Sequence, residues 1–219
     1  MIRLENVTKT YIKGEYTIKA LDDVSLEASK GEFIVVKGSS GCGKTTLLLT
    51  AGGLLHPQKG KVFIDNQDLY QLSNQEMSDF RSANIGFVFQ QYHLIPYLSI
   101  LENITIPSLA HEEEIPEKQA IALIDELGLN NRMHHTPGEL SAGEKQRTAL
   151  GRALLYNPKV ILADEITGNL DDKNATIVLA KLTEFSKSGG SVLLVTHDEK
   201  AFAYADRIIE LEKLKIVNA

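Results

Sequence analysis

Residues 33–45 read FIVVKGSSGCGKT, and this stretch decides the fold. The apolar run at its start is typical of a strand that is buried on both faces of a sheet. The eight residues from Gly38 to Thr45 match the pattern G-x-x-x-x-G-K-[ST], and residues 44–55 are rich enough in leucine and alanine to predict a helix. A phosphate-binding loop requires this setting between strand and helix. The stretch therefore predicts an α/β protein with a nucleotide-phosphate site.

Different residues of the loop are expected to make different contacts with a chain of phosphates. The glycines let the backbone curl, so that successive N–H groups and the positive end of the following helix face an anion. Lys44 adds a positive charge for the β- and γ-phosphates, and Thr45 offers a hydroxyl to Mg²⁺. We expect the side chain of Cys42 to point away from the phosphates. The residues that we expect to bind the nucleotide here are Gly38, Ser39, Ser40, Gly41, Cys42, Gly43, Lys44, Thr45 and Thr46.

A second apolar run, VILADE at residues 160–165, ends in two carboxylates. We interpret it as a strand beside the phosphate loop. Asp164 would then hold Mg²⁺ through a water molecule. Glu165 would orient or deprotonate the water that attacks the γ-phosphate.

The remaining pattern predicts a parallel sheet with a helical insertion. Apolar strands at 160–163 and 191–195 flank a helix at 171–185, and this alternation is typical of parallel α/β folds. Residues 103–156 are mainly helical in pattern. One helix would have Pro116 at its first position and Ile121, Ile124 and Leu127 on one face, and a second would cover 141–156. We interpret the acidic run at 112–114 as a solvated loop.

Composition limits the classes of function. The 219 residues suggest one large domain, and 23 basic against 29 acidic residues give a net charge of −6. Without a local basic stripe, this charge argues against nucleic acid as a partner. The single cysteine excludes an internal disulfide and fits a reducing compartment. No run approaches the roughly 20 apolar residues of a membrane span, so we expect a soluble, cytoplasmic protein.

Five further motifs resemble those of the ATP-binding cassette (ABC) family. Residues 140–147, LSAGEKQR, resemble its signature LSGGQ and the following arginine. Gln90 in FVFQQ resembles the Q-loop glutamine, and His197 in VTHD the switch histidine. Asp171 in GNLD matches the D-loop, and Tyr11 matches the aromatic residue that stacks on adenine. IGFVFQQYHLIP and ILADEITGNLD look most like the lipoprotein-releasing, macrolide-efflux and cell-division-type subfamily.

This resemblance implies a fold. It implies a P-loop NTPase (RecA-like) core with a mostly parallel sheet, an N-terminal antiparallel β part and an inserted α-helical subdomain. The whole chain, 1–219, would form one cassette domain. The ATP-binding core would cover about 1–89 and 157–219, and the helical signature subdomain about 90–156.

The resemblance also implies a mechanism. Two cassettes would close head to tail around ATP and Mg²⁺ and power a separate membrane permease, from the cytoplasmic face of the cell membrane. Asp171 would belong to the D-loop. Gln90 would reach Mg²⁺ and the attacking water, and His197 would hold the γ-phosphate and Glu165 in place. The residues that would contact ATP across the interface are Ser141, Gly143 and Glu144.

Two capping boxes give local support that does not depend on the family. Ser141-x-x-Glu144 predicts a helix start, whose free N–H groups suit a phosphate. Thr196-x-x-Glu199 predicts a second one, which would place His197 in a first helical turn at the carboxyl edge of the sheet.

Three residues depart from the family pattern. Ala142 replaces a glycine, Glu144 a glutamine, and Ile166 the proline after the catalytic glutamate. None of these changes removes a catalytic group. They lead to the hypothesis that the ATP-bound dimer is weak or transient.

Other functions remain open at this stage. An ATP-driven mechanical switch that acts on a membrane protein without transport would have nearly the same sequence. A DNA or ribosome ATPase would carry a coiled-coil insertion or a second cassette, and a small-molecule kinase would not explain LSAGE. Residues 91–106 are rich in tyrosine, leucine and isoleucine, and they either dock the permease or fill the core of the helical insertion.

Overall fold

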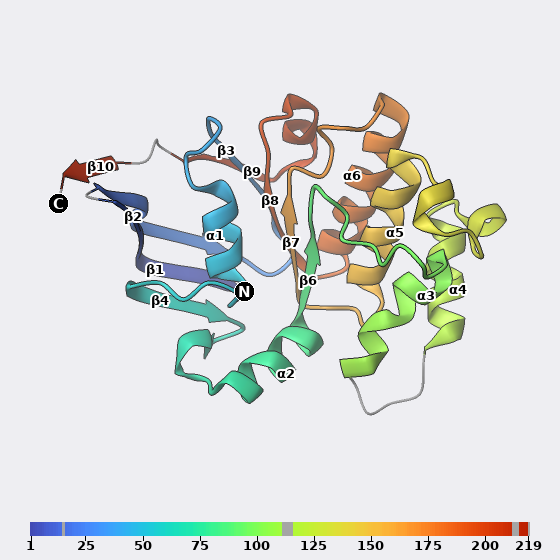
Figure 1. The fold of residues 1–219 in the computed structure, drawn as a ribbon, viewed down its shortest axis with the longest axis horizontal. Helices are drawn as coiled ribbons and strands as arrows, with labels where there is room; N and C mark the ends of the chain where they lie inside the picture. Colours follow the sequence, from blue (N-terminus) through green and yellow to red (C-terminus); the bar gives the residue numbers. More distant parts are fainter. Residues whose placement is uncertain (15, 111–115, 212–214, 219) are drawn as a thin grey trace.

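Two β-sheets with one α-helix between them form one side of the molecule (Figure 1). The computed structural model describes residues 1–14, 16–110, 116–211 and 215–218. The first sheet is antiparallel, with the order β10-β2-β1-β4-β5. Its strands are β1 (Ile2–Lys13), β2 (Tyr16–Ala28), β4 (Lys59–Ile64), β5 (Gln67–Asp68) and β10 (Lys215–Asn218).

The second sheet is parallel throughout, with the order β6-β7-β8-β3-β9. Its strands are β3 (Phe33–Lys37), β6 (Ile85–Val88), β7 (Val160–Asp164), β8 (Ser191–Val195) and β9 (Arg207–Glu210). The predicted strand at 191–195 is confirmed to the residue, and the two-sheet arrangement implied by the family resemblance is confirmed as well.

The parallel sheet separates two hydrophobic cores, and strand β3 contributes to both. Phe33 and Val35 pack into the core beneath α5 (Ala142–Leu154) and α6 (Asp172–Lys187). Ile34 and Val36 pack into the core around α1 (Lys44–Ala51). All four side chains are 0% exposed. The contiguous apolar run therefore marks a strand covered on both faces, as predicted.

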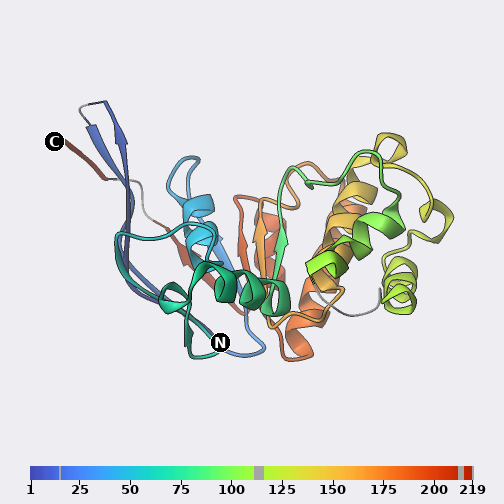
Figure 2. The same ribbon diagram turned by 60° about the horizontal axis from the view of Figure 1, so that its bottom comes forward.

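The helices lie on the two faces of the parallel sheet (Figure 2). Helix α1 is enclosed between the two sheets, while α5 and α6 cover the opposite face with α3 and α4 outside them. No helix within the described ranges is both long and apolar enough to cross a bilayer. The α-helices are α1 (Lys44–Ala51), α2 (Asn74–Asn84), α3 (Ile100–Thr105), α4 (Glu117–Glu126), α5 (Ala142–Leu154) and α6 (Asp172–Lys187). The 3₁₀ helices are η1 (Leu69–Gln71), η2 (Ile106–Ala110), η3 (Asn130–Arg132), η4 (Pro137–Glu139) and η5 (Glu199–Tyr204).

Helix α1 is shorter than predicted. It ends at Ala51, before two glycines, and Gly53 has a φ of +70°. The N–H groups of Leu54 and Leu55 both turn back to the carbonyl of Leu49, at 2.9 and 3.1 Å. The expected extension to residue 55 was wrong because this left-handed turn closes the helix.

The helical insertion between β6 and β7 contains α3, α4 and α5, and two details of α4 differ from the expectation. Pro116 caps the helix instead of occupying its first position. Ile121 is 40% exposed, whereas Ala120 and Ile124 are 0% exposed. Residues four apart share a helix face, so Ala120 takes the place expected for Ile121. The acidic run at 112–114 lies outside the described residues.

Leu194 in the central strand β8 offers a direct test of the core. Its side chain is 0% exposed. We expect L194A to lower the free energy of unfolding by about 2–5 kcal/mol, because the substitution leaves a cavity in a close-packed core. Urea denaturation measures this change. The matched control is L109A, because Leu109 is 82% exposed. Equal stability of the two variants would contradict the assignment of β8 to the core.

Candidate functional site

Four neighbouring strands of the parallel sheet end at one cavity of about 660 Å³. The phosphate loop follows β3, Gln90 follows β6, Asp164 and Glu165 lie at the end of β7, and His197 follows β8. The two carboxylates at the end of β7 lie beside the phosphate loop, as expected, although strand β8 separates β7 from β3 in the sheet. The cavity is lined by Tyr11, Ile18, Ala20, Gly38, Ser39, Ser40, Gly41, Gly43, Lys44, Thr45, Thr46, Gln90, Asp164, Glu165 and His197.

The phosphate loop opens the N-terminus of α1 toward this cavity. Gly43 is the N-cap of α1, with a φ of +103° and no side chain to satisfy the first N–H groups. A Cβ at this position would lie 2.2 Å from the carbonyl oxygen of Ala20 in β2. Only glycine fits this backbone conformation at this distance. Free N–H groups at a helix start are a favourable anion site.

Lys44 extends over the same loop. Its ammonium donates to the carbonyl oxygens of Gly38 at 2.8 Å and Ser39 at 3.3 Å. The side chain is buried, yet it lines the cavity. This geometry holds one positive charge at the centre of the loop.

Cys42 differs from the other loop residues. Its side chain is 2% exposed and does not line the cavity. The sulfur lies against Gly38, where an added Cβ would be 2.5 Å from it. The thiol therefore packs beneath the loop, away from the cavity.

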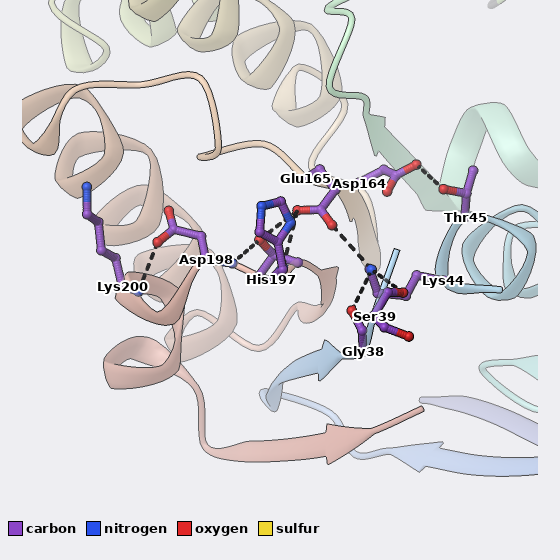
Figure 3. A network of polar contacts seen from close by, with 10 residues as sticks. Gly38, Ser39, Lys44, Thr45, Asp164, Glu165, His197, Asp198 and Lys200 are labelled. Carbon is purple, nitrogen blue, oxygen red and sulfur yellow. Dashed lines mark hydrogen bonds and ion pairs between the residues drawn. The ribbon is translucent and has the colours of Figure 1, made fainter. Parts of the chain in front are cut away.

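Thr45 and Asp164 provide oxygen atoms beside the loop. The hydroxyl of Thr45 donates to Oδ2 of Asp164 at 2.8 Å (Figure 3). Oδ1 of Asp164 is buried and has no hydrogen-bond partner among the described residues. Burial raises the pKa of this carboxyl group. A hydroxyl and a carboxylate with an unused oxygen fit the donor set that Mg²⁺ prefers.

Glu165 lies between two basic side chains in the cavity (Figure 3). Its carboxylate is 3.5 Å from the ammonium of Lys44 and 2.9 Å from Nδ1 of His197. The backbone N–H of His197 also donates to this carboxylate, at 3.2 Å. The φ of Glu165 is +49°, an uncommon left-handed value that carries strain for a residue with a side chain.

The surroundings of Glu165 favour its charged form. Burial acts to raise its pKa and is the largest influence. Hydrogen bonds from His197 and Thr196 together outweigh burial, so the pKa of Glu165 lies below its ordinary value. The carboxylate is therefore charged at neutral pH and can accept a proton from water.

Sequence reasoning missed the role of Thr196. Its hydroxyl donates to Glu165 at 3.0 Å and accepts the N–H of Asp198 at 3.0 Å. The predicted capping box with Glu199 was wrong, because Asp198 caps η5 and accepts the N–H of Lys200. His197 consequently precedes the helical turn instead of lying inside it. The signal that the sequence offers is a threonine immediately before His197, but the pattern Thr196-x-x-Glu199 favours a helix cap instead.

Two residues lie at the edges of the cavity. Gln90 is exposed directly beyond β6. Tyr11 comes from β1 in the other sheet and is 41% exposed, which leaves its ring free to contact a ligand. The two sheets thus contribute opposite sides of the same site.

The residues of the predicted signature lie outside this cavity. Ser141 is the N-cap of α5, and the capping box is confirmed: its hydroxyl accepts the N–H of Glu144, whose carboxylate accepts the N–H of Ser141 at 2.8 Å. Glu144 also lies 3.3 Å from Arg132. The backbone hydrogen bond from Ser141 is the main cause that lowers the pKa of Glu144. Its added negative charge is therefore compensated within the chain.

The D-loop is joined to the signature helix. Asp171 caps α6 and accepts the N–H of Asn174 at 2.8 Å, and it also accepts from the carboxamide of Asn174 at 2.7 Å. Arg147 of α5 donates to the other side of that carboxamide. A Cβ at Gly143 would lie 2.3 Å from the carboxamide of Asn174, so glycine permits the two helices to approach.

A phosphate loop after a buried parallel strand, with an acidic strand end facing it, defines a P-loop nucleoside triphosphatase. A model of the family described as ABC transporter matches residues 21–168. The chain belongs to this family, and it is an ATP-binding and ATP-hydrolysing cassette.

Its relatives support this assignment over nearly the whole chain. The chain is 41% identical to an uncharacterised ABC transporter ATP-binding protein of Methanocaldococcus jannaschii, over 99% of this chain and 98% of that protein. It is 39% identical to the lipoprotein-releasing system ATP-binding protein LolD of Shewanella oneidensis, over 97% and 94%. It is 45% identical to the macrolide export ATP-binding/permease protein MacB of Escherichia coli, but it spans only 33% of that protein.

Solved structures agree with the fold. A dimeric bacterial ABC transporter cassette superposes with a TM-score of 0.91 at 39% identity, over 98% of each chain. A dimeric post-hydrolysis state of an ATP-binding cassette, bound to ADP and Pi, gives a TM-score of 0.90 at 38% identity, over 100% of this chain and 98% of that one.

Thr196 provides a test of the electrostatics around Glu165. T196V removes a hydrogen bond that stabilises the carboxylate, so the pKa of Glu165 should rise. We expect the acidic limb of the pH profile of kcat/KM for ATP hydrolysis to move to higher pH. The control is T183V, because within the described part of the chain the hydroxyl of Thr183 donates to the carbonyl of Leu179 in α6 and to no other group. An unchanged acidic limb in T196V would show that this hydroxyl does not tune Glu165.

Proposed function

We propose that Glu165 is the catalytic base of ATP hydrolysis and that this chain uses hydrolysis to power a separate membrane permease. The position of Glu165 supports the proposal most directly: it faces the phosphate loop at 3.5 Å from Lys44 and is held by His197 at 2.9 Å. A charged carboxylate at this place can orient a water molecule and take its proton. His197 keeps the carboxylate turned toward the γ-phosphate.

The residues that line the cavity indicate which groups would contact each part of ATP. The backbone and side chains of the phosphate loop hold the phosphates, and Tyr11 stacks on the adenine. The unused oxygen of Asp164, the hydroxyl of Thr45 and the carboxamide of Gln90 would hold Mg²⁺, with Asp164 acting through water. Mg²⁺ neutralises charge on the β- and γ-phosphates.

A second copy of the chain completes the site. Ser141, Gly143 and Glu144 lie away from the chain's own cavity, at a helix N-terminus that suits a phosphate. We propose that they contact ATP bound to the partner cassette, in a head-to-tail dimer, and that Asp171 forms part of the D-loop. The dimeric cassettes that superpose on this chain support this arrangement. The chain itself would divide into a core of about 1–89 and 157–219 and a signature subdomain of about 90–156.

The partner in the membrane is inferred from the relatives. MacB is named as an ATP-binding/permease protein, and this chain spans about a third of it. We propose that a separate permease supplies the remaining function and that the chain works on the cytoplasmic face of the cell membrane. Within residues 91–106, part of the segment fills the helical core, and we propose that the exposed part docks the permease. Ile100 and Ile104 are 0% exposed in the core, whereas Tyr97 is 78% exposed and available to a partner.

The variant E165Q tests the catalytic base. Glutamine keeps the size of the side chain but cannot take a proton, so we expect ATP turnover to fall about a hundredfold or more. ATP affinity, measured by calorimetry, should stay within a few-fold of the wild type. Unchanged turnover would remove Glu165 from the role of base.

Ala142 tests the interface between two cassettes. It is exposed at the first position of α5, where its methyl group would face ATP of the partner. In the E165Q background with ATP, we expect A142G to tighten the dimer by up to about tenfold in its dissociation constant, because a steric contact is relieved. Sedimentation with and without ATP measures this. A142G should have no effect without ATP, and no effect with ATP would place the methyl group outside the interface.

A further inference from the structure

The strand that carries Tyr11 leaves its neighbour β4 before it reaches the cavity. The β1–β4 pairing ends at Thr8, which is opposite Lys59, the first residue of β4. Tyr11 lies three residues farther along β1, where the backbone pairs with Ile18 of β2. The ring is 41% exposed. A stacking residue in this position needs support from another part of the chain.

Gln58 supplies this support with its side chain. Its backbone N–H donates to the carbonyl of Thr8 at 2.9 Å. Its carboxamide then accepts the N–H of Thr10 at 2.9 Å and donates to the carbonyl of Thr10 at 3.1 Å. The carboxamide therefore acts as an additional peptide group, and it extends the hydrogen-bonded ladder to the residue immediately before Tyr11.

Lys9 adds a second connection to the same segment. Its ammonium donates to the carbonyl of His56 at 2.7 Å and lies 5.7 Å from the centre of the Tyr11 ring. A cation at this distance over an aromatic face is attractive. Lys9 thus holds the strand and contacts the ring that it carries.

The segment at 56–58 is itself fixed to α1. The hydroxyl of Tyr70 lies 2.7 Å from the carbonyl oxygen of Thr50 and 2.8 Å from that of Leu55. The ring of Tyr70 contacts that of His56, with centroids 4.5 Å apart. Helix α1 begins at the phosphate loop, so the position of Thr10 is set relative to the phosphate end of the cavity.

We propose that Gln58, with Lys9, is a positioning residue for Tyr11 and determines how tightly the cavity holds the base of a nucleotide, independently of its phosphates. The inference rests on the proposed function, in which Tyr11 stacks on adenine. Holding the strand in advance lowers the ordering cost of stacking. Loss of the carboxamide leaves the phosphate loop intact, because Gln58 does not line the cavity.

The test compares ADP with inorganic pyrophosphate, both with Mg²⁺, by calorimetry on the full chain. Q58L removes both hydrogen bonds to Thr10 at an exposed position. We expect ADP affinity to fall about three- to tenfold, because the substitution weakens the stacking contact without removing the ring, while pyrophosphate affinity stays within twofold. K9M should give a smaller loss in the same direction. The control is Q75L, because Gln75 is exposed on α2 and its carboxamide donates to Asp79 alone among the described residues.

Three outcomes would overturn the inference. Equal losses for ADP and pyrophosphate in Q58L would show that Gln58 supports the whole cavity. An unchanged ADP affinity in Q58L, with a loss in Y11A, would leave the stacking role of Tyr11 in place and remove Gln58 from it. An unchanged ADP affinity in Y11A would show that the proposed stacking itself is wrong.

Discussion

The close approach of the phosphate loop to strand β2 is the constraint on which the site depends. At Gly43 the loop passes so near the carbonyl of Ala20 that no side chain fits between them. This contact joins the two sheets at the start of α1, so the N–H groups of the helix face a cavity with one sheet on each side. Any larger residue at this position would push the sheets apart and separate the phosphate-binding side from the wall that contains Tyr11.

Charged side chains determine the arrangement of the acidic residues that face the phosphate loop. Glu165 is held in a left-handed conformation, with Lys44 at the start of α1 and His197 beyond β8 on either side of its carboxylate. Asp164, its neighbour in the chain, turns toward Thr45 instead. Two adjacent carboxylates therefore have different partners and opposite pKa shifts, raised for Asp164 by burial and lowered for Glu165 by hydrogen bonds. Such a difference between neighbouring acids is suited to separate tasks in metal binding and proton transfer.

Local patterns predicted the elements of this fold better than their arrangement. The apolar runs at Phe33–Lys37 and Ser191–Val195 identified buried strands because both faces of the sheet are covered. The order of the strands depends on contacts far apart in the chain, so the place of β8 between β3 and β7 could not be read from the pattern. The same limit applies to Thr196 at the end of β8, because its hydroxyl donates to Glu165 at the end of the neighbouring strand β7. Gln58 bonds to Thr10, 48 positions away in the chain, so its role could not be read from a local pattern either.

The burial of the parallel strands on both faces limits which parts of such a site can change during evolution. A slip of one residue in β7 or β8 would turn every apolar side chain to the wrong core, so the strands cannot slide to adjust the chemistry. The residues that follow the strands carry no such restriction. Substitutions in the short segments beyond the strand ends can therefore change the rate and the ligand preference. The spacing of the strands in the sheet still fixes the distances between those segments.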